Sequence, residues 1–86
     1  QRPENRCQYR TKQYIARVAE IKGNTVMFDI EGLKWAYSVK GLRNGAYGPP
    51  VSPDVKFLKN SMYVVTKKEL IKGDCRAELI VDITVR

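Results

Sequence analysis

Apolar and polar residues alternate with a period of two along much of this chain, and this pattern constrains its fold more than any other feature. Successive side chains of a β-strand point to opposite faces of a sheet, so the alternation predicts half-buried strands. The pattern is clearest between residues 25 and 31, where Val26, Phe28 and Ile30 alternate with Thr25, Met27, Asp29 and Glu31, of which the last two are acidic. These three apolar side chains are therefore expected to point into the core.

Four further stretches follow the same period. The five predicted strands lie at residues 14–21, 25–31, 33–40, 61–66 and 78–85. In the first and fourth strands both faces carry apolar residues, so either face can be the buried one. The third strand has one apolar face, which consists of Leu33, Trp35, Tyr37 and Val39. The last strand is expected to bury Leu79, Val81, Ile83 and Val85.

Short turns connect the first three predicted strands. Gly23 adopts a positive φ at no steric cost and Asn24 tolerates it, so this pair predicts a two-residue hairpin turn. Gly32 interrupts the alternation before the third strand, and three strands joined in this way form a meander. Five short antiparallel strands usually curl, because closure removes unpaired strand edges. The expected fold is mainly β: a small five-stranded antiparallel barrel or strongly curled sheet, either SH3-like or OB-like.

Two segments fall outside the alternation. Residues 41–60 combine Gly and Pro residues in a way that excludes a regular element and predicts a long loop. Apolar residues in its second half indicate that this loop is pinned to the domain, and loops of such length are often functional. Residues 67–72 either form one short helical turn, with Thr66 and Glu69 in the capping-box spacing, or belong to a wide hairpin closed by Gly73 and Asp74.

The short chain limits the size of the hydrophobic core, so a disulfide between its two cysteines would add substantially to its stability. The 86 residues predict one small domain, residues 1–86, with a basic N-terminal arm at residues 1–10. A chain of this size buries only about 60–65% of the surface that it exposes when unfolded. A disulfide between Cys7 and Cys75 would contribute about 4 kcal/mol, and the alternative is two unrelated thiols.

The expected cellular compartment of the protein is inferred from the same two cysteines and from the residue at position 1. The chain starts at Gln1 without Met, which fits either a processed exported protein or a trimmed chain. An exported location, periplasmic or extracellular, is slightly favoured over a cytoplasmic one, because disulfides persist in oxidising compartments. No apolar run approaches the roughly 20 residues that a membrane-spanning helix needs.

The formal net charge is +7, and the chain contains no His. Such a basic surface favours polyanions, namely nucleic acid, anionic lipid headgroups or acidic polysaccharide, without selecting among them. Without His there is no Ser–His or Cys–His pair, and two distant cysteines form no CxxC motif. The acid pairs of the second and last strands lie on faces where carboxylates are usually solvated. The chain is therefore expected to be no enzyme and to hold no metal or cofactor.

Binding is the better-supported class of function. The Gly, Pro and Asn residues around Tyr47 suit a recognition loop, which predicts an interaction module that contacts a protein or glycan partner. The alternative is a small barrel that binds single-stranded nucleic acid, because cations alternate with aromatic residues between Lys34 and Tyr47. However, the shared apolar face of Trp35 and Tyr37 favours a core position for both. The predicted binding surface consists of Lys34, Lys40, Arg43, Asn44, Tyr47, Pro49 and Pro50.

Overall fold

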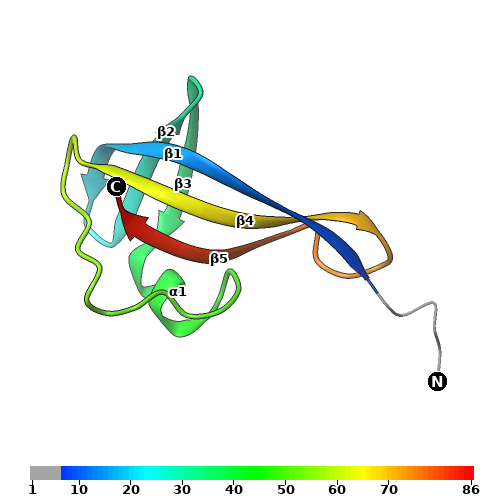
Figure 1. Ribbon diagram of the computed structural model, residues 1–86. Coiled ribbons are helices and arrows are strands. Elements are labelled where there is room, and N and C mark those ends of the chain that lie inside the picture. Colours follow the sequence, from blue (N-terminus) through cyan, green and yellow to red (C-terminus); the bar gives the residue numbers. More distant parts are fainter. Residues whose placement is uncertain (1–6) are drawn as a thin grey trace.

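The computed structural model describes residues 7–86 as one curled antiparallel sheet with a short helix (Figure 1). The elements follow one another as β1 (Gln8–Lys22), β2 (Thr25–Ile30), β3 (Leu33–Ser38), α1 (Val39–Asn44), β4 (Met62–Lys72) and β5 (Glu78–Val85). The strand order in the sheet is β3-β2-β1-β4-β5. The predicted mainly-β class and the five antiparallel strands are thereby confirmed. The sheet does not close into a barrel, and β3 and β5 form its two edges.

The first three strands form the expected meander, because two tight turns connect them. Lys22 of β1 pairs with Thr25 of β2, so Gly23 and Asn24 are the two turn residues, as predicted. Ile30 of β2 pairs with Leu33 of β3 across a second turn in which both intervening residues have positive φ. That geometry matches the right-handed twist of the flanking strands and brings β3 directly beside β2.

The core lies on the inner face of the curled sheet, and Phe28 is at its centre. Val26, Phe28 and Ile30 are buried, as their alternation with acidic residues predicted. The Phe28 ring makes edge-to-face contacts with Phe57, at 5.9 Å between ring centroids, and with Tyr63, at 6.1 Å. Strands β1, β4 and β5 complete the core with small and branched side chains, of which Ala16, Val18, Val65, Ile80 and Ile83 are buried.

A β-bulge explains why the first strand showed apolar residues on both faces. Val18 pairs with Phe28 whereas Glu20 pairs with Met27, so Ala19 is an extra residue that reverses the alternation. The buried face on the core side is that of Ala16 and Val18. Strand β1 also starts earlier than predicted, so residues 8–10 of the expected basic arm belong to the sheet. The first six residues of that arm lie outside the described residues.

The second half of the chain corrects two predictions. Residues 67–72 form no helical turn, because they continue β4 and pair with β1. The alternative prediction, a wide hairpin closed at Gly73 and Asp74, is the one that the structure has, since β4 pairs with β5 across residues 73–77. The inward residues at the start of β5 were also assigned wrongly. A register shift pairs Thr66 with Asp82 but Lys67 with Ile80, which buries Ile80 in place of Leu79 and Val81. Ile83 is buried as predicted, whereas Val85 at the end of the strand is 66% exposed. Every side chain before the bulge at residue 81 therefore lies on the face opposite to the predicted one.

The single helix was not predicted, since residues 39–44 were divided between the third strand and the loop. Ser38 begins α1 as its N-cap, because its hydroxyl oxygen accepts a hydrogen bond of 3.0 Å from the Gly41 N–H. Gly45 ends the helix in the left-handed conformation, with φ of 89°. Strand β3 consequently stops at Ser38 rather than at residue 40. Among residues 7–86, no helix is long and apolar enough to cross a membrane.

Candidate functional site

The segment from α1 to β4 is fixed against the sheet by side chains that point inward. Leu42 of α1 and Val51 are buried, and the Val51 N–H donates a hydrogen bond of 2.9 Å to the Leu42 carbonyl. Further along, Phe57 packs against Phe28, and the Tyr63 hydroxyl accepts a hydrogen bond of 2.9 Å from the Leu58 N–H. The prediction that this loop is pinned to the domain is therefore confirmed.

Tyr47 anchors this loop to the sheet, and its side chain is half-buried. Its hydroxyl oxygen accepts a hydrogen bond of 3.0 Å from the Ser38 N–H, and its ring lies edge-to-face against Tyr37 at 5.0 Å. Its carbonyl accepts a hydrogen bond of 2.8 Å from the Ile80 N–H of β5. Residues of the loop thus cover part of the open side of the sheet, between its edges β3 and β5.

Gly48 is required for this close approach to β5. A Cβ atom at this position would lie 2.3 Å from the Ile80 carbonyl oxygen, and the φ of Gly48 is 146°. Real Cβ atoms do not approach backbone oxygen so closely, so any other residue would push the loop away from the strand. The glycine spacing around Tyr47 therefore has a structural cause in the packing of the loop on β5.

The outward side of the same segment is basic and rich in proline. We call it the loop face, and it consists of Lys40, Arg43, Asn44, Pro49, Pro50 and Lys56, all of them exposed. The Arg43 guanidinium donates a hydrogen bond of 2.8 Å to the Val55 carbonyl, which holds α1 against the loop. Within the described chain, none of the three cations of the loop face forms an ion pair.

Lys34, like the inward-packed Tyr47, is a predicted binding residue that is not part of the loop face. It is on β3 and forms an ion pair of 3.4 Å with Asp29, which also pairs with Arg17 at 3.3 Å. Partial burial alone would raise the pKa of Asp29, but the hydrogen bond from Lys34 and the two cationic charges hold it below its ordinary value. Lys34 is therefore engaged on the sheet, while five of the six loop-face residues come from the predicted surface.

A buried lysine forms a second polar cluster, which the alternation pattern did not reveal. Lys67 on β4 is only 1% exposed, and its Nζ lies 2.6 Å from Oε1 of Glu78 on β5. The same Nζ lies 3.7 Å from the centroid of the Trp35 ring on β3, which is a cation–π contact. Lys67 thus joins side chains of both edge strands across the open side. The feature of the sequence that could have predicted its burial is that Lys67 lies two residues after Val65, on the same face of the strand.

Tyr14 extends this cluster along β1. Its ring lies edge-to-face against Trp35 at 5.3 Å, and its hydroxyl donates a hydrogen bond of 2.5 Å to the Glu69 carboxylate. This hydrogen bond raises the pKa of Tyr14 to about 12 and lowers the pKa of Glu69. Trp35 is consequently half-buried with a cation over its ring, as the core interpretation favoured. All aromatic side chains of residues 7–86 are buried or half-buried.

Substitution of Lys67 tests the contribution of this cluster to stability. Lys67→Ala is expected to lower the free energy of unfolding by about 2–3 kcal/mol, because it leaves a cavity beside Trp35 and removes the cation–π contact. Lys67→Met keeps the aliphatic stem and should lose only about 1 kcal/mol. Urea unfolding followed by Trp35 fluorescence measures both. Equal stability of the Ala variant and the unsubstituted protein would contradict this role.

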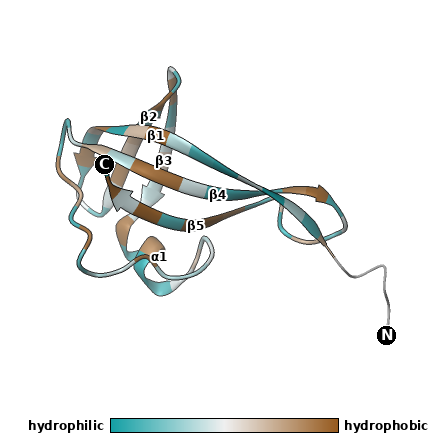
Figure 2. Ribbon diagram, viewed as in Figure 1, coloured by the Kyte–Doolittle hydropathy of each residue, from teal (hydrophilic) through white to brown (hydrophobic). Residues whose placement is uncertain are grey.

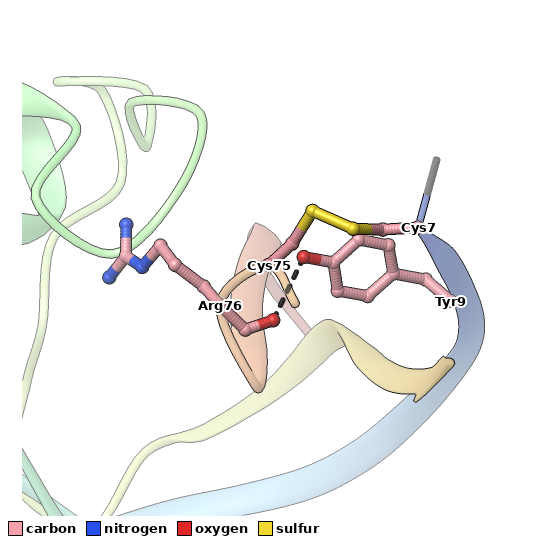
Figure 3. The surroundings of a disulfide bond; sticks show 4 residues. All are labelled: Cys7, Tyr9, Cys75 and Arg76. Carbon is pink, nitrogen blue, oxygen red and sulfur yellow. Dashed lines mark hydrogen bonds between the residues drawn. A yellow bond between two sulfur atoms is a disulfide. The ribbon is translucent and has the colours of Figure 1, made fainter. Parts of the chain in front are cut away.

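The two cysteines form a disulfide at the far end of the molecule. Cys7 and Cys75 are bonded, which joins the start of β1 to the turn between β4 and β5 (Figure 3). Beside them, the Tyr9 hydroxyl donates a hydrogen bond of 2.8 Å to the Arg76 carbonyl. This end of the sheet is therefore held together although it contributes nothing to the core.

Comparisons with known proteins gave no match to a protein-family model, to a curated protein or to a solved structure. Within residues 7–86, no group of three or more His, Cys, Asp or Glu side chains is arranged to hold a metal ion.

Proposed function

We propose that this protein is a non-enzymatic binding module whose loop face contacts an acidic partner, either a protein or a glycan. The observation that carries the proposal is the contrast between the two sides of one segment. Its inward side chains fix it to the core and to β5, while its outward cations have no acidic partner in the described chain. An interface of this kind attracts anionic partners and suppresses cationic ones.

The rigidity of the loop supports this function. A flexible loop must be ordered when it binds, and each immobilised side chain or segment reduces the affinity. Here Tyr47, Val51 and Phe57 already hold the loop in one conformation before any partner arrives. The prolines at positions 49 and 50 restrict the outward part of the backbone further. A preformed, basic and proline-bearing surface is therefore available for contact.

The disulfide supports an exported location. Disulfides persist in oxidising compartments, such as the bacterial periplasm or the extracellular space, and are rare in reducing ones. The Cys7–Cys75 bond is therefore expected to be permanent in the place where the protein acts. Release of two thiols from denatured protein that was purified without reductant would contradict this part of the proposal.

Single-stranded nucleic acid remains the second candidate partner, and one feature of the fold favours it. Strand β1 pairs with both β2 and β4, and a helix lies between β3 and β4, which we interpret as an OB-like rather than SH3-like arrangement. OB folds commonly bind oligonucleotides or oligosaccharides. The inward packing of the aromatic side chains argues against base stacking, so this candidate ranks second.

Three charge-neutralising substitutions on the loop face test the main proposal. The variant Lys40→Gln, Arg43→Gln, Lys56→Gln should bind a heparin oligosaccharide or poly-glutamate about tenfold more weakly, because each exposed ion pair contributes up to about 1 kcal/mol. The matched control carries Lys22→Gln, Lys68→Gln and Arg86→Gln, which change the net charge by the same amount elsewhere. Isothermal titration calorimetry at constant salt gives the affinities.

Each result of this experiment decides between the candidates. A selective loss in the loop-face variant supports the proposal, and equal losses in the two variants would show that only the net charge matters, which contradicts it. Tight binding of oligo-dT accompanied by a change in Trp35 fluorescence would favour the nucleic-acid candidate instead.

A further inference from the structure

One long strand edge of the sheet has no partner in the described part of the chain. Strand β1 pairs with β4 from Gln8 to Arg17, but with β2 only from Arg17 to Lys22. On the β2 side, residues 8–16 therefore have no backbone neighbour between residues 7 and 86. Figure 1 shows the cause, since the β2–β3 hairpin turns away from β1 while β1, β4 and β5 continue together as a ribbon in which β4 is the central strand. An unpaired edge of this length is a template for an added strand.

The backbone groups that face this edge can be assigned. In an antiparallel strand, successive residues direct their N–H and C=O groups to alternate edges. The Val18 N–H points away from the free edge, because it donates a hydrogen bond of 3.0 Å to the Ser61 carbonyl on the β4 side. The pairing of β1 with β4 is regular from Tyr9 to Arg17, so the alternation holds between them. Thr11, Gln13 and Ile15 consequently direct their N–H and C=O groups to the free edge.

The side chains along the edge indicate which kind of strand fits beside it. Residues 8–16 carry two cations, Arg10 and Lys12, and no acid, and this part of β1 is hydrophilic in Figure 2. The two cations are two residues apart, so they share one face of the strand. A second copy of the chain would place its own cations beside them, and like charges in neighbouring strands are destabilising. An added strand with Asp or Glu at alternate positions would instead pair with both.

The ribbon is also rigid, although none of the side chains at residues 8–13 is buried. The Cys7–Cys75 disulfide, the Tyr9–Arg76 hydrogen bond and an Arg10–Glu69 ion pair of 3.5 Å hold it in place. These links leave the outward backbone groups of the free edge untouched, because they join β1 to β4 and to the turn beyond it. The Arg10 side chain remains 63% exposed beside Glu69, so its guanidinium stays accessible to a second carboxylate. A strand template that is ordered in advance does not lose affinity to its own ordering.

We propose that the free edge of β1, residues 8–16, binds an extended acidic segment of a partner protein by strand addition. The partner segment hydrogen-bonds to the outward backbone groups of Thr11, Gln13 and Ile15, and its alternate carboxylates lie beside Arg10 and Lys12. Main-chain hydrogen bonds supply the affinity and the alternate side chains supply the selectivity, as in other β-augmented complexes. This site is separate from the loop face and does not depend on the function proposed above.

The test uses a proline at an outward position. Thr11→Pro removes one outward N–H and places a ring at the edge, but it leaves the β1–β4 ladder intact, because prolines are tolerated on edge strands. The control Thr11→Val keeps the N–H and similar side-chain volume. The probe is a fluorescein-labelled peptide of alternating Glu and Val residues, about ten residues long to match the edge at roughly 3.3 Å per residue. We expect saturable binding, weakened about tenfold or more by Thr11→Pro and little by Thr11→Val.

Hydrogen exchange on the unsubstituted protein keeps the test decisive even if the proline variant folds poorly. Bound peptide should slow exchange of the Thr11, Gln13 and Ile15 amide protons and leave the loop face unchanged. The proposal is overturned if the peptide does not bind, if it binds both Thr11 variants equally, or if protection appears elsewhere. If the protein sediments as a dimer and the Thr11→Pro variant does not, the edge binds a second copy of the chain. That result would overturn the proposal of an acidic partner. Substitution of Lys40, Arg43 and Lys56 should not change peptide binding, which separates this result from the loop-face experiment.

Discussion

Replacement of Phe28 by Ala is expected to lower the free energy of unfolding by about 3–5 kcal/mol, since it removes a buried aromatic ring and leaves a cavity. The ring is fully buried and contacts Tyr37, Phe57 and Tyr63. The sheet and the loop therefore meet on this one side chain. A domain of this size has a total stability of only about 5–15 kcal/mol, so the variant should be close to unfolded at room temperature. Urea unfolding followed by far-UV circular dichroism measures the change.

The neighbouring residue on the same strand supplies the control. Met27 is half-buried on the opposite face of β2, so Met27→Ala should cost about 1 kcal/mol or less. Phe28→Leu fills part of the cavity and should fall between the two. If Phe28→Ala and Met27→Ala destabilise equally, Phe28 is not the centre of the core, and the packing described above is wrong.

Reduction of the disulfide is expected to have an effect of similar size. Cys7 and Cys75 are 68 residues apart, so their bond restricts most of the unfolded chain, and the chain-entropy relation gives about 4 kcal/mol of stabilisation. The ribbon that it clamps has no buried side chain in residues 8–13, so the backbone ladder with β4, the Tyr9–Arg76 hydrogen bond and the exposed Arg10–Glu69 ion pair are what else opposes fraying there. The urea midpoint should fall on addition of a reductant, and amide exchange should rise first in the ribbon.

A variant with both cysteines replaced by Ser separates the cross-link from other effects of the reductant. The Cys7→Ser, Cys75→Ser protein should unfold at the lower midpoint and should not respond to reductant. An unchanged midpoint after full reduction would show that the bond does not restrict the unfolded chain. The same variant should bind the acidic peptide more weakly, because the free edge of β1 would no longer be ordered in advance.

The strands that the sequence predicted well are those whose outward face carries charge. In β2, acids alternate with Val26, Phe28 and Ile30, so only one burial pattern avoids desolvating a carboxylate. The Gly23-Asn24 turn was equally clear, because Gly23 accepts the positive φ that the turn has at this position. Where both faces are apolar or a bulge intervenes, as at Ala19 of β1 and residue 81 of β5, a period of two no longer identifies the buried side.

The candidate site was predicted in part. Proline and basic residues marked the loop face, because such residues are rarely found in a core. Tyr47 was assigned to the contact surface, whereas its contacts with Ser38, Tyr37 and Ile80 turn it inward. Lys67 was missed because a lysine is buried only where an aromatic face and a carboxylate meet it. Those partners come from β3 and β5, which are remote in the sequence.

The amino-acid sequence by itself determined the class of the fold, the meander of the first three strands and the position of the long loop. All of these follow from local preferences: alternation, turn residues and the exclusion of Gly and Pro from regular elements. The tertiary structure alone decided that the sheet stays open, that Lys67 bridges its edges and that β1 keeps a free edge from residue 8 to residue 16. These features depend on how far each strand extends past its neighbour. The twist and the bulges of the whole sheet set that distance, so it cannot be read from any single segment of the sequence.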